Sequence, residues 1–175
     1  LVEQIADANL PVRGAGLFRA IVFRSRVDEA EHMALVMGSL EAGAAAHPLL
    51  VRVHAENRLA DSLGLRTARQ SIYGALKHIA DEGRGVFIYL RHPRRGFLRE
   101  QVQALSNSQQ PARAMQLREY GVGIQILRAL GVKQIRLLTN NKRDIPGLNA
   151  FDLEIVERVP YSLAQKPPQD WSLGV

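Results

Sequence analysis

The stretch SIYGALKHIADEGRGVFIYLR, residues 71–91, decides the fold, because its hydrophobic pattern changes from that of a helix to that of a strand. A helix over residues 70–81 is predicted by apolar side chains that recur at the spacing of one helix face. These side chains are Ile72, Ala75, Leu76 and Ile79. Residues 83–85 carry two glycines that end the helix, and the continuous apolar run at residues 86–90 is typical of a strand covered on both faces.

The segments on either side of this unit complete the pattern. Strands are predicted before it at residues 17–24, 32–37 and 49–54, with a polar turn at residues 26–29. After it, we predict a break at residues 93–96, a loop at 105–111, a helix at 114–130 and strands at 134–139 and 151–159. An antiparallel β portion followed by alternating strands and helices indicates an α/β (α+β) fold with a mixed β-sheet and flanking helices. We place one domain at residues 1–160 and an extended tail at residues 161–175.

The composition is that of a globular protein. Hydrophobic residues make up 46% of the 175-residue chain and charged residues 23%. The apolar runs are much shorter than the roughly 20 residues that span a bilayer, so we expect no membrane association and a cytoplasmic location. The chain contains no cysteine, which excludes disulfides and thiolate-bound metals. It begins with Leu1 rather than Met, and we expect it to be a fragment of a longer protein.

The formal net charge of +6 favours anionic partners. Three interpretations remain open: a solvated basic surface, a site for a phosphate-bearing small molecule, or a nucleic-acid surface. Nucleic acid is the weakest of the three, because aromatic residues are only 6% of the chain and no recognition motif is present.

Six blocks of the sequence resemble GTP cyclohydrolase II in the order in which that family has them. They are EHMALVMG (31–38), PLLVRVHAEN (48–57), IADEGRGVFIYLR (79–91), REYGVGIQILRALGV (118–132), IRLLTNN (135–141) and LEIVERVP (153–160). The resemblance covers about residues 13–160 and implies a GTP cyclohydrolase II-like fold. It also implies a homodimer, and a fused or associated 3,4-dihydroxy-2-butanone 4-phosphate synthase domain, because residues 1–14 resemble the segment just past that junction.

The family opens the imidazole ring of GTP with a Zn²⁺ ion held by three Cys, and this sequence lacks those ligands. The first Cys falls on Asn57, after His54 and Glu56, and the other two fall in the segment 63–70, which is shorter than the family pattern. A replacement site would have to use nitrogen and oxygen ligands, and their spacing matches no known motif. The available side chains are His54, Glu56, Asp61 and His78. We therefore expect no zinc and no other cofactor.

The resemblance also places a proton-accepting Asp and a reactive Arg before the second helix. The Arg is retained as Arg118, whereas the Asp position is Gln116, which cannot accept a proton at neutral pH. Arg118 is equally consistent with a surface residue that pairs with Glu119.

Contacts to phosphate are retained in part. The family's phosphate-binding turn corresponds to residues 92–96, which keep Arg95, and a family Lys falls beside Arg143, on Asp144. The candidate ligand-binding residues are Arg52, Glu56, Arg95, Thr139 and Arg143. A cluster of arginines can hold phosphate through charge-assisted hydrogen bonds, but such a cluster is also typical of a solvated face.

Taken together, these losses predict a catalytically inactive domain of a riboflavin biosynthesis protein, which acts as a dimerisation or regulatory module for the synthase. Two alternatives remain. One is a metal-free enzyme that acts on another nucleotide or phosphorylated substrate, and the other is a module that senses a flavin or nucleotide.

Overall fold

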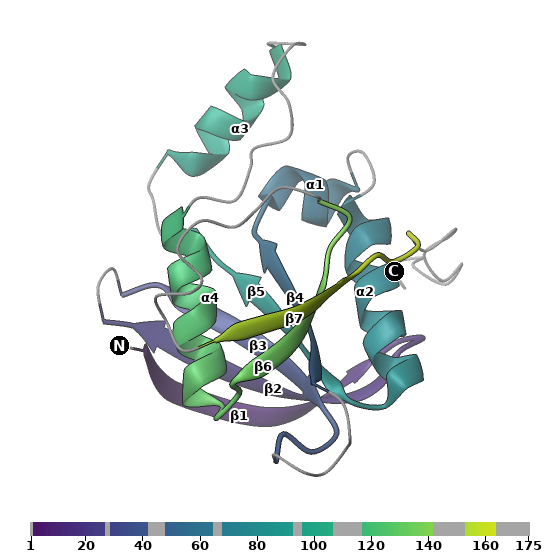
Figure 1. The fold of residues 1–175 in the computed structure, drawn as a ribbon. Helices are drawn as coiled ribbons and strands as arrows, with labels where there is room; N and C mark the ends of the chain where they lie inside the picture. Colours follow the sequence, from purple (N-terminus) through teal and green to yellow (C-terminus); the bar gives the residue numbers. More distant parts are fainter. Residues whose placement is uncertain are drawn as a thin grey trace.

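The computed structural model describes residues 2–26, 29–41, 48–64, 68–92, 96–106, 117–141 and 153–163. Within these ranges, seven strands form one sheet in the order β1-β2-β3-β5-β4-β6-β7 (Figure 1). The strands are β1 (Val2–Val12), β2 (Gly16–Ser25), β3 (Glu31–Met37), β4 (Leu49–Ala55), β5 (Gly85–Leu90), β6 (Gln134–Leu138) and β7 (Glu154–Val159). The helices are α1 (Arg58–Leu63), α2 (Ala68–Glu82), α3 (Phe97–Ser106) and α4 (Leu117–Ala129).

The sheet is mixed, as predicted from the sequence. Strands β1, β2, β3 and β5 pair antiparallel to one another, whereas β5, β4, β6 and β7 pair in parallel. The carboxyl ends of the four parallel strands therefore meet at one edge of the sheet. Ligands of open α/β sheets bind outside such an edge, so this arrangement decides where a site is to be sought.

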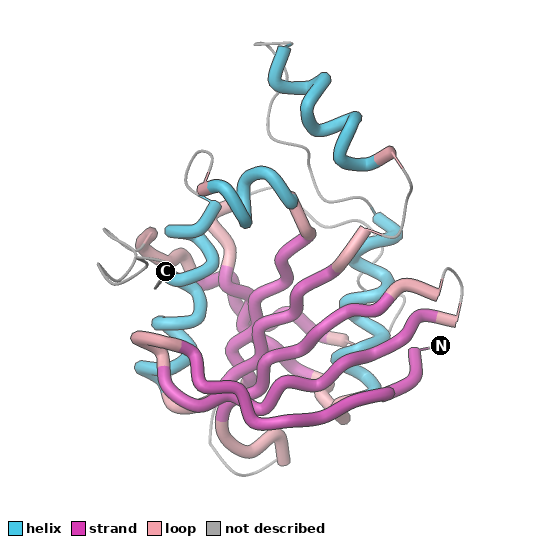
Figure 2. Tube along the Cα trace, turned by 180° about the vertical axis from the view of Figure 1, so that it is seen from behind, coloured by secondary structure: helices cyan, strands magenta, loops and turns pink. Residues whose placement is uncertain are grey.

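Helices α2 and α4 cover opposite faces of the sheet (Figures 1 and 2). One core cluster joins α4 to the sheet through Ile124, Ile126 and Leu127, and a second joins α2 through Ala75, Leu76 and Ile79. Strand β5 serves both clusters, since its side chains alternate between the two faces. This confirms the prediction of a strand covered on both sides, and the predicted helix at residues 70–81 is α2.

Three elements were missed in the sequence. Strand β1 is a largely exposed edge strand, so its side chains show no alternation of apolar and polar residues. Helix α1 is only six residues long, too short to show a periodic pattern. Helix α3 buries only Phe97, and it includes residues 105 and 106, which we had predicted to be loop; the rest of that predicted loop, 107–111, lies outside the described residues.

The remaining predictions differ from the structure at their ends. The predicted helix 114–130 corresponds to α4, which ends at Ala129, and residues 114–116 lie outside the described residues. The last predicted strand corresponds to β7; Leu153 precedes this strand, and residues 151 and 152 lie outside the described residues. Residue 161 was assigned to an extended tail, yet Tyr161 is only 8% exposed and packs in the α2 cluster. Residues 164–175 lie outside the described part of the chain. No helix among the described residues is long and apolar enough to cross a membrane.

Candidate functional site

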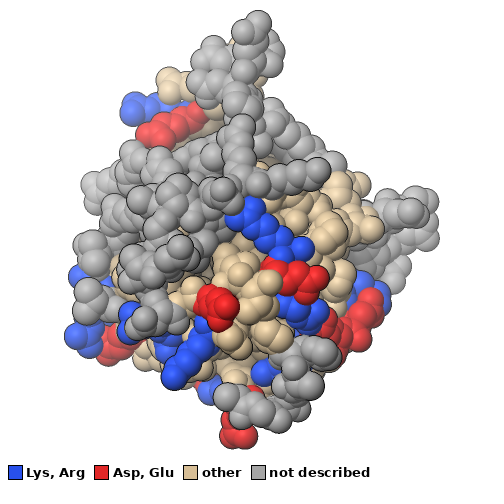
Figure 3. Space-filling view, in the orientation of Figure 1, with Lys and Arg blue, Asp and Glu red and all other residues tan. Residues whose placement is uncertain are grey.

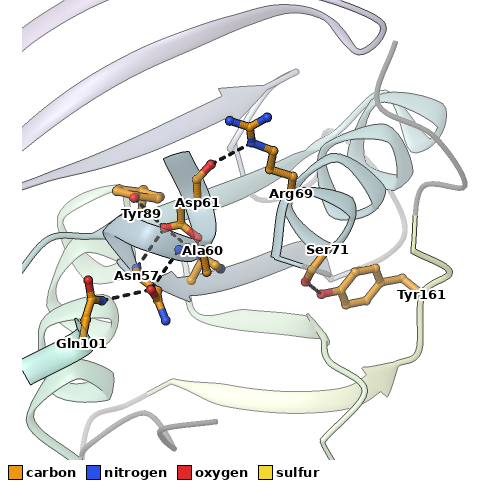
Figure 4. A network of polar contacts seen from close by, with 9 residues as sticks. Asn57, Ala60, Asp61, Arg69, Ser71, Tyr89, Gln101 and Tyr161 are labelled. Atoms are coloured by element: carbon orange, nitrogen blue, oxygen red, sulfur yellow. Dashed lines mark hydrogen bonds and ion pairs between the residues drawn. The ribbon is translucent and has the colours of Figure 1, made fainter. Parts of the chain in front are cut away.

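A buried carboxylate lies at the edge where β4 and β5 end. Asp61 of α1 is 8% exposed, and its oxygens accept hydrogen bonds from His54 Nε2 (3.1 and 3.2 Å), Tyr89 Oη (2.7 Å) and the Asn57 backbone N–H (2.9 Å) (Figure 4). The His54 ring is stacked with Tyr89, with ring centroids 5.5 Å apart. Gln101 of α3 joins this group through a hydrogen bond to Asn57. We call the five residues Asp61, His54, Tyr89, Asn57 and Gln101 the Asp61 network.

Asp61 is an ionised acceptor in this network. Burial raises its pKa, but the hydrogen bond and charge of His54, the Asn57 N–H and the Tyr89 hydroxyl together outweigh burial and hold the pKa below its ordinary value. Because an ionised carboxylate only accepts, His54 Nε2 carries a proton. Burial, together with the hydrogen bond to Asp61, raises the pKa of the Tyr89 hydroxyl, which therefore stays a donor.

Asn57 caps helix α1. Its Oδ1 accepts from the Ala60 N–H (3.1 Å), while its own N–H donates to Asp61, a reciprocal pair of bonds similar to a capping box. The same Oδ1 accepts from Gln101 Nε2 of α3 (3.0 Å). The side-chain oxygen that stands at the family's first metal-ligand position therefore holds two hydrogen bonds of its own, one to α1 and one to α3.

Glu56 belongs to a second chain of contacts that joins β5 to α4. Its carboxylate accepts from the His92 N–H (3.0 Å), and His92 Nε2 lies 2.8 Å from Glu119 Oε1. The His92 ring lies against Phe97, the first residue of α3, with centroids 4.2 Å apart. Glu56 was predicted to bind ligand, which stays a prediction; in the structure its carboxylate accepts a hydrogen bond from the backbone just after β5.

A hollow opens on the same sheet edge between β4, β6, β7 and α4. It is partly open to solvent, has a volume of about 30 Å³ and is lined by Arg52, Val53, Tyr120, Leu137, Leu138, Thr139, Asn141 and Arg158. We call it the basic hollow, because among these lining residues the charged ones are Arg52 and Arg158. Its volume is far below the roughly 300–1,000 Å³ of sites that enclose a drug-sized ligand, so only a small group of a ligand would enter it.

The polar groups of the basic hollow are mostly donors. Burial raises the pKa of Tyr120, and nearby Glu119 adds to the rise while Arg52 and Arg158 oppose it, so the phenol keeps its proton. The Thr139 hydroxyl oxygen accepts a hydrogen bond from the Asn141 N–H (3.0 Å). The hydrogen of the Thr139 hydroxyl can therefore be donated to another acceptor. Two guanidinium groups and two hydroxyls make this hollow suited to an anion such as a phosphate group.

Charges of both signs are mixed on the described part of one face of the molecule. On the face shown in Figure 3, the visible Lys and Arg side chains alternate with Asp and Glu and do not form a continuous cationic surface. A nucleic-acid surface would need such a stripe or patch of one sign.

The structure brings together two of the predicted ligand-binding residues, Arg52 and Thr139. Arg118 lies in the first turn of α4, and the structure describes its backbone but not its side chain. Arg95, Gln116 and Arg143 also lie outside the described residues. Sequence reasoning missed Tyr120 and Arg158, although each lies inside a quoted block.

The residues present do not fit a zinc ion of the family's kind. His54 and Asp61 bind each other, Glu56 binds the backbone of His92, and His78 lies on α2. Within the described ranges, no group of three His, Asp or Glu side chains is placed to hold a metal ion. The expectation that the protein binds no zinc remains a prediction.

Comparison with known proteins gives one consistent result. A sequence model of the GTP cyclohydrolase II family matches residues 3–160. The chain is 40% identical over 182 residues to the riboflavin biosynthesis protein RibBA of Bacillus cereus, and 40% identical over 179 residues to RibBA of Bacillus subtilis. Each alignment covers 95% of this chain and 44% of the relative, so the chain spans less than half the length of these curated relatives.

Among solved structures, the fold is similar to RibBX from A. baumannii, described as a two domain 3,4-dihydroxy-2-butanone 4-phosphate synthase. The TM-score is 0.53 at 24% sequence identity, and the match covers 89% of this chain and 40% of that one. This likeness supports the mixed α/β fold.

Proposed function

Because the chain belongs to the GTP cyclohydrolase II family, we propose that it is a member that does not open the ring of GTP and that acts as an assembly and regulatory domain within riboflavin biosynthesis. The chemistry of the family depends on a zinc-activated water, and a metal of this kind lowers the pKa of its water toward neutrality. The chain has no cysteine to hold such a metal and no carboxylate at residue 116, so we infer that it lacks the groups that would form and deprotonate the attacking hydroxide.

The observation that carries the proposal is the pair of hydrogen bonds that the Asn57 side chain accepts. The place of the first metal-binding thiolate holds an amide whose oxygen already accepts from Ala60 N–H and Gln101 Nε2. Those bonds connect α1 to α3, so the Asn57 side chain has a structural role. A zinc ion would have to compete with both bonds for a ligand type that zinc seldom uses.

The proposed partner is a 3,4-dihydroxy-2-butanone 4-phosphate synthase domain. The proposal is supported by the names of the relatives, which are riboflavin biosynthesis proteins of more than twice this length, and by the two-domain synthase whose fold is similar. Assembly as a homodimer is part of the same proposal and rests on the family resemblance.

The first test is the zinc content. After incubation with zinc and gel filtration, the purified protein is expected to carry much less than one zinc per chain by atomic emission spectroscopy, because no thiolate is present to hold the ion. One tightly held zinc per chain would contradict the proposal. The matched variants His54→Ala and His78→Ala decide the origin of any bound metal, since a site built from nitrogen and oxygen ligands would lose its zinc in one of them.

A second candidate function is the sensing of a phosphate-bearing small molecule, such as a nucleotide or flavin mononucleotide. The observation in its favour is the basic hollow, whose lining includes Arg52, Arg158 and Tyr120 at the carboxyl edge of the sheet. A ligand that raises the thermal midpoint and is not consumed supports sensing, whereas one that is consumed supports a metal-free enzyme.

A further inference from the structure

Arg52 has a side chain that two contacts hold in place. Its Nη1 donates to the Leu138 carbonyl oxygen (3.1 Å), and its guanidinium carbon lies 5.4 Å from the centroid of the Tyr161 ring. A guanidinium at this distance over an aromatic face is attracted by the ring. The two contacts fix a side chain that would otherwise sample many rotamers, and the same side chain lines the basic hollow.

Tyr161 is itself fixed at both ends. Asn140 accepts from the Tyr161 N–H (3.1 Å) and donates to the Tyr161 carbonyl oxygen (2.9 Å), so one amide side chain takes both backbone bonds of this residue. At the far end of the ring, the Tyr161 hydroxyl shares a 2.6 Å hydrogen bond with Ser71 Oγ of α2 (Figure 4). Tyr161 is also buried, with 8% of its surface exposed, so its ring is held in place by packing as well as by these bonds.

We propose that Tyr161 is a positioning residue that presets the Arg52 guanidinium for a phosphate group bound in the basic hollow. The inference rests on the second candidate function, and it adds a residue outside every block that carried the family resemblance. A side chain ordered before binding loses less entropy when the ligand arrives, so preorganisation strengthens binding without adding a contact.

The ligand class follows from the charges of the hollow. Two arginines, Arg52 and Arg158, are among the residues that line a space whose described lining contains no carboxylate. A phosphate monoester or inorganic phosphate offers pairs of oxygens, and a planar guanidinium group can bind two of them at once through two N–H groups. Titration with inorganic phosphate, flavin mononucleotide and GTP separates a bare phosphate site from one that also recognises the organic part.

The test measures the dissociation constant of each probe by isothermal titration calorimetry on the intact protein. Tyr161→Leu removes the ring and is expected to weaken phosphate binding about tenfold. Tyr161→Phe keeps the ring and loses only the bond to Ser71, so binding is expected to weaken by less than about threefold. The control Lys77→Gln removes a cation from the exposed side of α2 and should leave the constant unchanged.

A double-mutant cycle separates positioning from general structure. In the Arg52→Gln background, the Tyr161→Leu change should have little further effect, because the guanidinium that Tyr161 positions is gone. Equal weakening in both backgrounds would overturn the inference. If the wild-type protein binds a probe and Tyr161→Leu binds it equally well, the inference fails while the sensing function stands; if the wild type binds none of the three probes, both fail.

Discussion

Replacing Asp61 with alanine is expected to lower the free energy of unfolding by about 3 kcal/mol. The carboxylate accepts from Tyr89, from the Asn57 N–H and from His54, and its side chain is 8% exposed. Removing it leaves those donors without the acceptor that they share in the folded protein. Urea denaturation followed by circular dichroism measures the change.

The matched control for this substitution is Asp81→Ala on α2. Asp81 is 63% exposed and pairs with Lys77 one turn away, a contact that contributes less than about 0.5 kcal/mol on a surface helix. If both variants lost the same free energy of unfolding, the Asp61 network would not stabilise this edge of the sheet more than a surface ion pair does.

Acid unfolding provides a second test of how much the Asp61 carboxylate stabilises the fold. Because the pKa of Asp61 is lower in the folded protein than in the unfolded chain, its contribution is complete above an unfolded pKa of about 3.9 and is lost as the pH falls through the folded pKa. Stability should therefore fall less steeply below about pH 4 in Asp61→Ala than in the wild type. An identical slope in both proteins would show that Asp61 titrates normally.

Replacing Gly85 with alanine is expected to lower the free energy of unfolding by about 2 kcal/mol. A Cβ at this residue would lie 2.7 Å from the Leu50 carbonyl oxygen and 2.9 Å from Ile79 Cγ2. The first is backbone of the neighbouring strand β4 and the second is a core side chain of α2, so neither can move without disturbing the packing. Guanidinium denaturation measures the loss.

Gly121 provides the opposite case within the same fold. It lies inside α4, and a Cβ there would meet nothing within 4 Å, so Gly121→Ala should stabilise the protein by up to about 1 kcal/mol through helix propensity. Destabilisation of similar size in both alanine variants would contradict the assignment of Gly85 to a close contact between layers.

Much of the fold could be predicted because its central elements are strongly patterned. Helix α2 and strand β5 carry their periodicity in the sequence, since α2 buries one face and β5 buries both. Strand β1 could not be found in the same way, because an edge strand that is mostly exposed is under no pressure to alternate. Helix α3 was missed because Phe97 alone of its side chains is buried.

The candidate site was predictable only in part. Arg52 and Thr139 stood out through the blocks that resemble the family, and the structure places both at one hollow. Arg158 and Tyr120 reach the same hollow from β7 and α4, a convergence that depends on strand order and is invisible along the chain. Tyr161 was assigned to a tail because Pro160 precedes it, and only packing against Arg52 and Ser71 reveals its position.

The most direct test of the central claim is formate release from GTP by the purified protein, measured with and without added zinc. The account predicts no formate above a protein-free control in either condition, because the thiolates and the proton acceptor of the family are absent. Formate release at a rate that rises with zinc and scales with protein concentration would contradict it.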